Sequence, residues 1–255
     1  MNIISSIRSL IQPSYCSCCA ESVPPLGAGT LAPAAFKVGV IETPLPGVPW
    51  RHVYSARNAV PGGPVDNNVS MDVFALADGT ALVFGTGYGS IRQGTAGNAR
   101  SVTDDVNDVA TAMNALGVSD PTAISYAAPH GHGDHINAAF IDEMERLWYP
   151  TQEIAFHAGD TSRISALPGW TSSNRKWFTG VQATSCATLP LSYQLTDGYT
   201  ASLVSRPGHT PGSIDMDIGN VTGIVVARIL GSKDSTRCQK PPGALIVQAH
   251  GNGTP

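Results

Sequence analysis

Charge is scarce in this sequence. Asp, Glu, Lys and Arg make up 13% of the 255 residues, and the formal net charge is −4. Lys and Arg form no cluster that could follow a phosphate backbone, which argues against a nucleic-acid-binding protein. No apolar run reaches the length that spans a bilayer, so we expect no membrane span. These absences favour a soluble globular protein.

Cysteine is also rare and irregularly placed. Of the five, Cys16, Cys18 and Cys19 lie together near the N-terminus, and Cys186 and Cys238 stand alone. An odd number without regular spacing argues against a disulfide framework and favours a reducing compartment. No second half of a zinc ribbon follows the N-terminal group. We therefore interpret this group as part of an exposed tail, with a metal site or an acylation site as the alternatives.

The first 35 residues differ from the remainder. Residues 1–20 contain one Arg and no acidic residue, a composition shared by transit peptides. A stretch rich in Pro, Gly and Ala follows at residues 24–35. We therefore predict a disordered leader or linker at residues 1–35 and one folded domain at residues 36–255. We expect a cytoplasmic protein, and the composition of the leader leaves a mitochondrial address open.

The folded part shows the patterns of both strands and helices. Asp78-Gly79 and Asp197-Gly198 each separate two strand-like runs, as in tight hairpins. Hairpins mixed with separate helices indicate layered α/β structure. The predicted strands cover residues 36–43, 70–77, 80–85, 123–128, 154–156, 191–195, 199–205, 224–230 and 244–247, and the predicted helices cover residues 103–116 and 138–148.

The strongest chemical signal is a histidine-rich loop. Three of the seven histidines fall within residues 130–135, which read His-Gly-His-Gly-Asp-His. Residues two apart in an extended segment point the same way, so His130 and His132 can face one metal ion. The glycine that follows lets the backbone turn, so Asp134 and His135 can face a second ion. Imidazole and carboxylate groups are the ligands that zinc takes in catalytic sites. The alternative is a polar surface loop that is rich in histidine.

This loop resembles the His-x-His-x-Asp-His hallmark of the metallo-β-lactamase superfamily. Residues 208–212, Gly-His-Thr-Pro-Gly, are similar to the turn that carries the family's next metal ligand. The resemblance runs from residue 36 to residue 218 and implies an α/β fold of the metallo-β-lactamase type, an αββα sandwich. It implies a first metal held by His130, His132 and His209 and a second held by Asp134 and His135. The alternative for His209 is a turn histidine at the end of a strand.

The resemblance implies two further metal ligands near the C-terminal end, where the match is looser. Asp234 is the best candidate for the Asp that bridges both metals, although a plain loop residue is the alternative. His250 matches the last ligand because it follows an apolar run, and an exposed terminal histidine is its alternative. Only 21 residues (255 − 234) follow Asp234. We therefore expect a C-terminal end shorter than the family's, and complete two-metal occupancy is open.

Three other positions bear on this site. Gly85 stands where the family commonly has the Asp of Asp-Thr-Gly, so one carboxylate that supports the metal ligands is missing. We expect this to weaken metal affinity or ligand alignment. His52 we interpret as an ordinary loop residue in a Pro-rich segment. His157 follows a predicted strand, and we interpret it as a structural residue, with a place at the border of the pocket as the alternative.

The resemblance implies a zinc-dependent hydrolase with one or two Zn²⁺ ions per chain, iron being the alternative metal. Zinc lowers the pKa of bound water from about 15.7 to about 7, so a metal-bound hydroxide can attack a carbonyl carbon at neutral pH. Asp134 would orient this nucleophile and move a proton. The expected substrate is a small ester, lactone, thioester or β-lactam. The aromatic segment at residues 170–178 either lines the substrate pocket or forms local core.

Two alternatives to the zinc hydrolase stay open. One is an iron-dependent sulfur dioxygenase-type oxidoreductase on the same fold, which metal analysis would separate from a zinc enzyme. The other is a non-catalytic metal-binding member that has lost the distal ligands. The sequence defines no oligomeric state.

Overall fold

The computed structural model describes most of the predicted domain. It covers residues 39–58, 67–87, 101–119, 121–147, 149–167, 169, 175–178, 186, 188–232 and 239–249. The predicted leader at residues 1–35 lies outside the described residues, as do Asp234 and His250 and part of the aromatic segment at 170–178.

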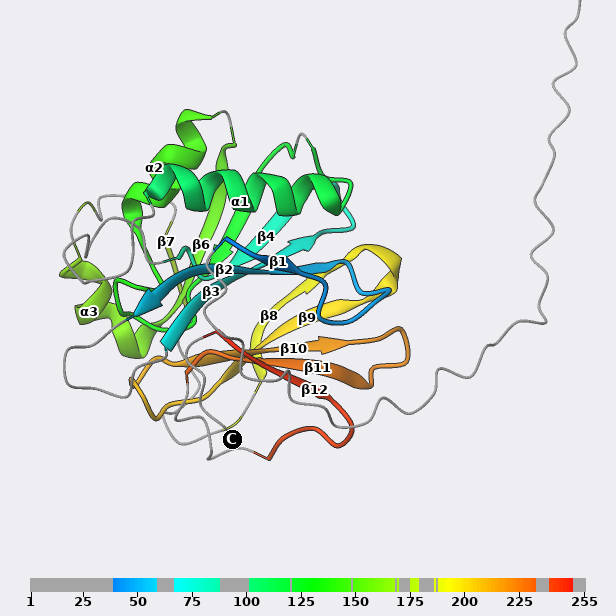
Figure 1. Cartoon of the computed structure of the whole chain (residues 1–255). Coiled ribbons are helices and arrows are strands. Elements are labelled where there is room, and N and C mark those ends of the chain that lie inside the picture. The colour runs from blue at the N-terminus through cyan, green and yellow to red at the C-terminus, as the bar shows by residue number, and fades with distance from the viewer. Residues whose placement is uncertain are drawn as a thin grey trace, which may run out of the picture.

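Two β-sheets pack face to face and form the frame of the protein (Figure 1). The seven-stranded sheet runs in chain order through β1 (Ile41–Glu42), β2 (Trp50–Asn58), β3 (Asn67–Ala75), β4 (Ala81–Phe84), β5 (Ile124–Ala127), β6 (Thr151–His157) and β7 (Arg175–Phe178). The five-stranded sheet has the order β12 (Leu245–Gln248), β11 (Val225–Leu230), β10 (Ile214–Gly219), β9 (Thr200–Ser205) and β8 (Thr188–Gln194).

Strand direction in the seven-stranded sheet follows from the connections. β3 and β4 are antiparallel and meet at the predicted Asp78-Gly79 turn, where the Asp78 carboxylate accepts hydrogen bonds from the Thr80 backbone N–H (3.0 Å) and hydroxyl (2.6 Å). β4, β5, β6 and β7 are parallel. Parallel neighbours need crossover segments, and α1 (Val102–Ala115) and α2 (Ala138–Arg146) supply two of them. The parallel strands therefore end at one common edge of the sheet.

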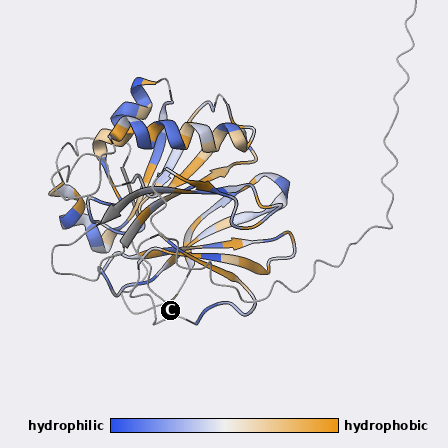
Figure 2. Ribbon diagram, in the orientation of Figure 1, coloured by the Kyte–Doolittle hydropathy of each residue, from blue (hydrophilic) through white to orange (hydrophobic). Residues whose placement is uncertain are grey.

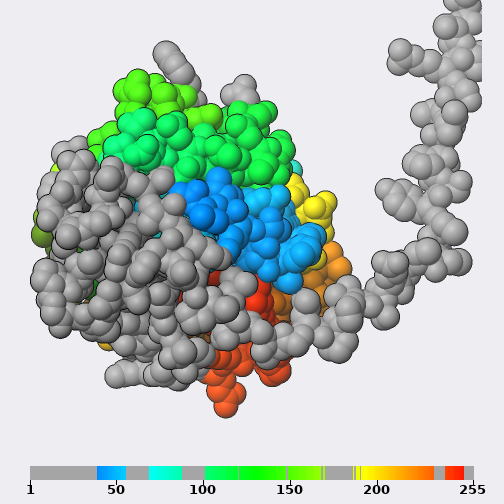
Figure 3. Space-filling model, viewed as in Figure 1, coloured from blue at the N-terminus to red at the C-terminus, as the bar shows by residue number. Residues whose placement is uncertain are grey.

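Helix α1 begins where the sequence predicts it, at an acidic first turn. Ser101 caps it, and the Ser101 and Asp104 side chains each accept a hydrogen bond from the other's backbone N–H, forming a capping box. Val106, Val109 and Met113 lie buried on one face of the helix. This face packs on the seven-stranded sheet, so α1 and α2 form an outer layer above it (Figures 1 and 3).

Two apolar cores result from this layering. One lies between the helices and the seven-stranded sheet, and the other fills the space between the two sheets. Trp50 and Phe74 from the first sheet stack in the inter-sheet core, with ring centroids 5.9 Å apart. Figure 2 shows the hydrophobic colour gathered on strands between the layers, with hydrophilic residues frequent on the helices. Burial of large apolar side chains stabilises each core by about 1.5–3 kcal/mol per residue.

The predicted α/β class and two-sheet sandwich are confirmed. Both Asp-Gly turns join antiparallel strands, since β8 and β9 also pair in this way. In the part of the chain that the structure describes, helices α1 and α2 cover one outer face, and no helix lies over the outer face of the five-stranded sheet. Among the described residues, no helix is long and apolar enough to cross a membrane.

Two expectations about single residues are wrong. His52 is not a surface loop residue: it lies buried on β2, and its Nδ1 is 2.7 Å from Oδ1 of Asp72, which also accepts a hydrogen bond from Trp50. Cys186 is disulfide-bonded, contrary to the expectation from cysteine spacing. Disulfides are typical of oxidising compartments, so this residue does not support the expected reducing compartment.

Candidate metal centre

The histidine-rich loop leaves the common edge of the parallel strands directly after β5. Thr86, just beyond β4, anchors its far end: the Thr86 N–H donates to the carbonyl of His135 (3.1 Å), and the Thr86 hydroxyl oxygen accepts from the N–H of Asn137 (2.6 Å). Inside the loop, the N–H groups of His135 and Ile136 both donate to the carbonyl of His132. These hydrogen bonds hold the loop in a turn at the ends of β4 and β5.

His209 comes from the other sheet. It lies in the turn between β9 and β10, which closes when the N–H of Arg206 donates to the carbonyl of Ser213 (2.8 Å). The first N–H of β10, at Ile214, donates to the carbonyl of Pro129 (2.7 Å), one residue before the histidine-rich loop. The two sheets therefore join by a backbone hydrogen bond beside the predicted ligands.

Three imidazole rings converge at this junction. The ring centroids of His130, His132 and His209 lie 4.8, 4.6 and 4.8 Å apart, with interplanar angles of 86°, 84° and 89°. Nε2 of His209 is 3.1 Å from Nδ1 of His132. Each ring offers one nitrogen such that all three nitrogens lie within 4.8 Å of one another. This arrangement can hold one metal ion.

A second group of donors overlaps the first. His130, Asp134 and His135 also offer atoms within 4.8 Å of one another. The rings of His130 and His135 have centroids 4.2 Å apart, and Nε2 of His135 is 3.9 Å from Oδ2 of Asp134. The structure thus brings together all five residues of the two predicted motifs, with His130 common to both groups.

The environment of His130 favours its neutral form. Burial lowers the pKa of His130 well below its usual value, and His135 adds to this effect. Nδ1 of His130 lies 3.0 Å from the carbonyl oxygen of Gly231. Because a carbonyl only accepts, Nδ1 is the donor, and the lone pair of the neutral ring lies on Nε2. Burial also lowers the pKa of His132, which likewise favours the neutral ring that can bind a metal ion.

Gly231, just beyond β11, is held by a buried ion pair that sequence reasoning missed. Its N–H donates to Oδ1 of Asp215 (2.9 Å), and Oδ2 of Asp215 pairs with the guanidinium of Arg206. Burial raises the pKa of Asp215 to about 6, although Arg206 opposes this shift. A Cβ at position 231 would lie 1.9 Å from the carbonyl oxygen of Ile214, so the close approach requires glycine.

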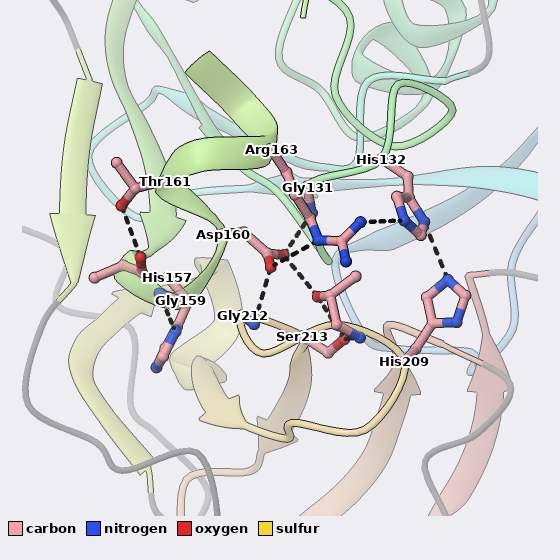
Figure 4. Close-up of polar contacts among 12 residues, drawn as sticks. Gly131, His132, His157, Gly159, Asp160, Thr161, Arg163, His209, Gly212 and Ser213 are labelled. Atoms are coloured by element: carbon pink, nitrogen blue, oxygen red, sulfur yellow. Dashed lines mark hydrogen bonds and ion pairs between the residues drawn. The ribbon is translucent and has the colours of Figure 1, made fainter. Parts of the chain in front are cut away.

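A second carboxylate beside the loops was also missed. Asp160 ends the short helix η2 (Ala158–Asp160), which follows β6 and precedes α3 (Thr161–Ser165). Figure 4 shows it between the two ligand-bearing turns, the segments at residues 130–135 and 208–212 that carry the predicted ligands, with hydrogen bonds to both. From α3, Nη1 of Arg163 reaches to 3.2 Å of Nε2 of His132. His157 is buried and accepts a hydrogen bond from the N–H of Gly159, in keeping with its expected structural role.

The expected loss of a carboxylate at position 85 has a backbone basis. Gly85 has φ of +82°, a region that favours glycine, and a Cβ there would lie 3.2 Å from the carbonyl oxygen of Ser70. Any residue with a side chain would therefore strain the backbone at position 85.

The described residues stop just short of Asp234 and His250, the two predicted distal ligands. Ser232 is buried directly after Gly231, and Asp234 lies beyond it, outside the described residues. The N–H of Ala249 donates to the carbonyl of Leu230 (2.9 Å). The carbonyl of Ala249 accepts from the N–H of Ser70 (3.1 Å). His250 lies outside the described residues.

The fold and site define a two-sheet α/β protein with a histidine-lined candidate metal centre. No protein-family model matches the sequence, and no curated protein matches it. Solved structures give weak similarities.

A metallo-β-lactamase from Cronobacter sakazakii with substitutions in its HARLDQ motif shares 14% identity at a TM-score of 0.41, over 71% of this chain and 59% of that one. A metallo-β-lactamase from Hirschia baltica shares 14% identity at a TM-score of 0.47, over 76% and 70%. A class B3 di-zinc metallo-β-lactamase from an Alaskan soil metagenome shares 15% identity at a TM-score of 0.37, over 69% and 65%. The chain thus spans less than two thirds of the first and third of these structures.

Proposed function

We propose that this protein is a zinc-dependent hydrolase of the metallo-β-lactamase type that acts on a small ester, lactone, thioester or β-lactam. The observation that carries this proposal is the convergence of the His130, His132 and His209 rings at the junction of the two sheets. The residues come from two sequence motifs, with His132 and His209 77 positions apart, and their nitrogens lie within 4.8 Å of one another.

The donor set fits zinc. Three imidazole ligands with one coordination position left open form a common catalytic zinc site. The hydrogen bond from His130 to the Gly231 carbonyl fixes that ring's orientation, as the outer partners of metal ligands do. When bound, zinc would activate a water molecule for attack on a carbonyl carbon at neutral pH.

Asp134 is the residue to which we assign the proton transfer. Its side chain is 14% exposed, and it lies in the donor group with His130 and His135. A carboxylate in this position can orient the attacking water and carry its proton to the leaving group. The same carboxylate can serve as a ligand of a second metal.

The second metal site would be completed by Asp234 and His250. Support comes from the described residues next to them: Ala249 bonds to Leu230, which precedes the Gly231 that contacts His130. Ala249, the last described residue, therefore lies beside the end of β11, next to the Gly231 carbonyl that contacts His130. With Asp234 and His250 as additional ligands, the hydrolase would hold two zinc ions.

Arg163 supports a substrate with a negatively charged group. Its side chain is 46% exposed and its guanidinium lies 3.2 Å from the ring of His132. A guanidinium beside the reacting centre can bind a carboxylate with two parallel hydrogen bonds.

Metal analysis combined with a substrate panel tests the proposal. Full-length protein purified without added metal is expected to contain one to two zinc ions per chain. It should hydrolyse at least one of a set of chromogenic esters, lactones, thioesters and β-lactams, and a chelator should abolish this activity. Full activity after exhaustive metal removal would overturn the proposal. Iron as the predominant metal, with sulfur-dioxygenase activity, would replace it with the oxidoreductase alternative.

A further inference from the structure

We propose that Asp160 is a positioning residue whose carboxylate locks the two ligand-bearing turns together and so sets the separation of His209 from His130 and His132. The consequence for metal binding rests on the proposed function. The lock itself is a property of the protein's own hydrogen bonds.

The carboxylate of Asp160 bonds to both turns. Oδ2 accepts from the N–H of Gly131 (2.7 Å) and from the hydroxyl of Thr210 (2.6 Å), and Oδ1 accepts from the N–H of Gly212 (3.1 Å). Gly131 lies between His130 and His132, and Thr210 follows His209. Each turn is therefore held at a residue adjacent to a predicted ligand (Figure 4).

The backbones around Asp160 approach so closely that only glycine fits. A Cβ on Gly131 would lie 2.9 Å from Cβ of Asp160, and a Cβ on Gly212 would lie 2.6 Å from its Cγ. A Cβ on Gly159 would lie 2.8 Å from the carbonyl carbon of Pro211. Each of the three segments thus carries a glycine at the contact. This packing brings all three donors within reach of one carboxylate.

A carboxylate suits this position better than any other side chain. Asp160 is 1% exposed, so its charge has to be satisfied by protein donors. An ionised carboxylate only accepts, and it faces three hydrogen-bond donors and the Arg163 guanidinium, whose Nε lies 3.9 Å from Oδ1. An amide in its place would turn an N–H towards one of these donors and lose that bond. Asp160 also provides the kind of outer carboxylate support that Gly85 lacks, and it does so from a different part of the chain.

Asp160→Asn tests the lock through metal affinity and ligand geometry. We expect the Zn²⁺ dissociation constant, measured on full-length protein by competition with a chromophoric chelator, to rise about 10–100-fold. The visible spectrum of the Co²⁺-loaded protein should also change, because it reports the geometry of the ligands. Asp217→Asn is the matched control. It also removes a carboxylate, but Asp217 on β10 pairs with Arg228 on β11, away from the residues that contact Asp160. Parental affinity and spectrum in Asp160→Asn would overturn the proposal, as would equal changes in both variants.

Thr210 offers a second, gentler test if Asp160→Asn does not fold. Thr210→Ser keeps the hydroxyl that donates to Asp160, and Thr210→Val keeps the shape without the donor. We expect Thr210→Ser to retain the parental Co²⁺ spectrum and Zn²⁺ affinity, and Thr210→Val to lose affinity by several-fold. Identical behaviour of the two variants would contradict a lock that acts through this bond.

A metal-free measurement separates this proposal from the proposed function. Amide hydrogen exchange at Gly131 and Gly212 reports the two backbone bonds to Asp160 directly. In metal-free protein, Asp160→Asn should speed exchange at these two amides relative to those in the centre of the sheets. Unchanged exchange would refute the lock even if the parent binds zinc. Faster exchange in Asp160→Asn, together with a parent protein that binds no metal, would support the lock and refute the zinc hydrolase.

Discussion

The two ligand-bearing turns differ in what they contribute and in how they are held. The histidine-rich loop brings His130, His132, Asp134 and His135 from the seven-stranded sheet, and Thr86 anchors it to a neighbouring strand of that sheet. The turn after β9 brings His209 alone among the described donors. His130 and His135 are buried, whereas His132 and His209 are partly exposed. The seven-stranded sheet thus carries four of these five predicted ligands, and the five-stranded sheet carries the fifth.

Removal of the single ligand from the five-stranded sheet should have the largest effect. His209→Ala leaves His130 and His132 as two ligands, which is too few for a stable catalytic zinc site. We expect hydrolysis to fall below detection and the first metal to be lost, with the fold retained by circular dichroism. Asp217→Asn, a change in the same sheet away from the cluster, should leave activity intact. Activity in His209→Ala near that of the parent would show that the histidine-rich loop is sufficient alone.

Asp134→Asn should have the next largest effect. The amide keeps the size of the side chain and removes the charge that orients the nucleophile and accepts its proton. We expect kcat to fall at least about a hundredfold, within the range of general acid–base groups. Steady-state kinetics with metal content measured in parallel check this. Wild-type turnover at wild-type metal content would remove Asp134 from the mechanism.

Changes at Asp234 and His250 should affect the second metal more than the first. Asp234→Ala and His250→Ala are each expected to lower the zinc content from two ions towards one, because the three-imidazole group does not depend on them. Metal counts at fixed free Zn²⁺, with circular dichroism as the control for folding, test this. If both variants keep the parental zinc content and turnover, neither residue is a ligand.

Gly231→Ala should have the smallest effect of these changes, and it acts through packing. Its Cβ would lie 1.9 Å from the Ile214 carbonyl oxygen, so the end of β11 has to shift. We expect a loss of about 1–3 kcal/mol in the free energy of unfolding, as for other overpacked positions. Gly219→Ala is the matched control in the same sheet, because the atoms nearest to its Cβ, the carbonyl oxygens of Ile224 and Thr200, would lie 3.9 Å away. Denaturant unfolding of the two variants should separate them clearly.

The sequence predicted the local parts of the fold and site well. The histidine-rich loop, the turn at His209, both Asp-Gly hairpins and α1 depend on residues close together in the chain. β10 was missed although Ile214, Met216 and Ile218 alternate with Asp, a pattern typical of a strand. β2 was missed because prolines precede it and polar residues such as His52 interrupt its apolar run.

The outer partners of the ligands were missed for a different reason. Asp160 lies 29 positions from Gly131 and 50 from Thr210, and Gly231 lies 101 positions from His130. No local spacing relates such residues. A signal was present only for Asp215, a charged residue inside an apolar strand-like segment, where burial requires a partner. These contacts become visible once the two sheets are placed together.

The location of the site at the junction of the sheets makes it a thermodynamic cross-link. A metal ion held by His130 and His132 on one side and His209 on the other would bind the assembled fold and would have lower affinity for separated sheets. By mass action, each tenfold rise in free metal above the dissociation constant adds about 1.4 kcal/mol to the apparent stability. The melting temperature would then depend on the concentration of free metal. Metal depletion would weaken the contact between the two sheets before it weakened either sheet.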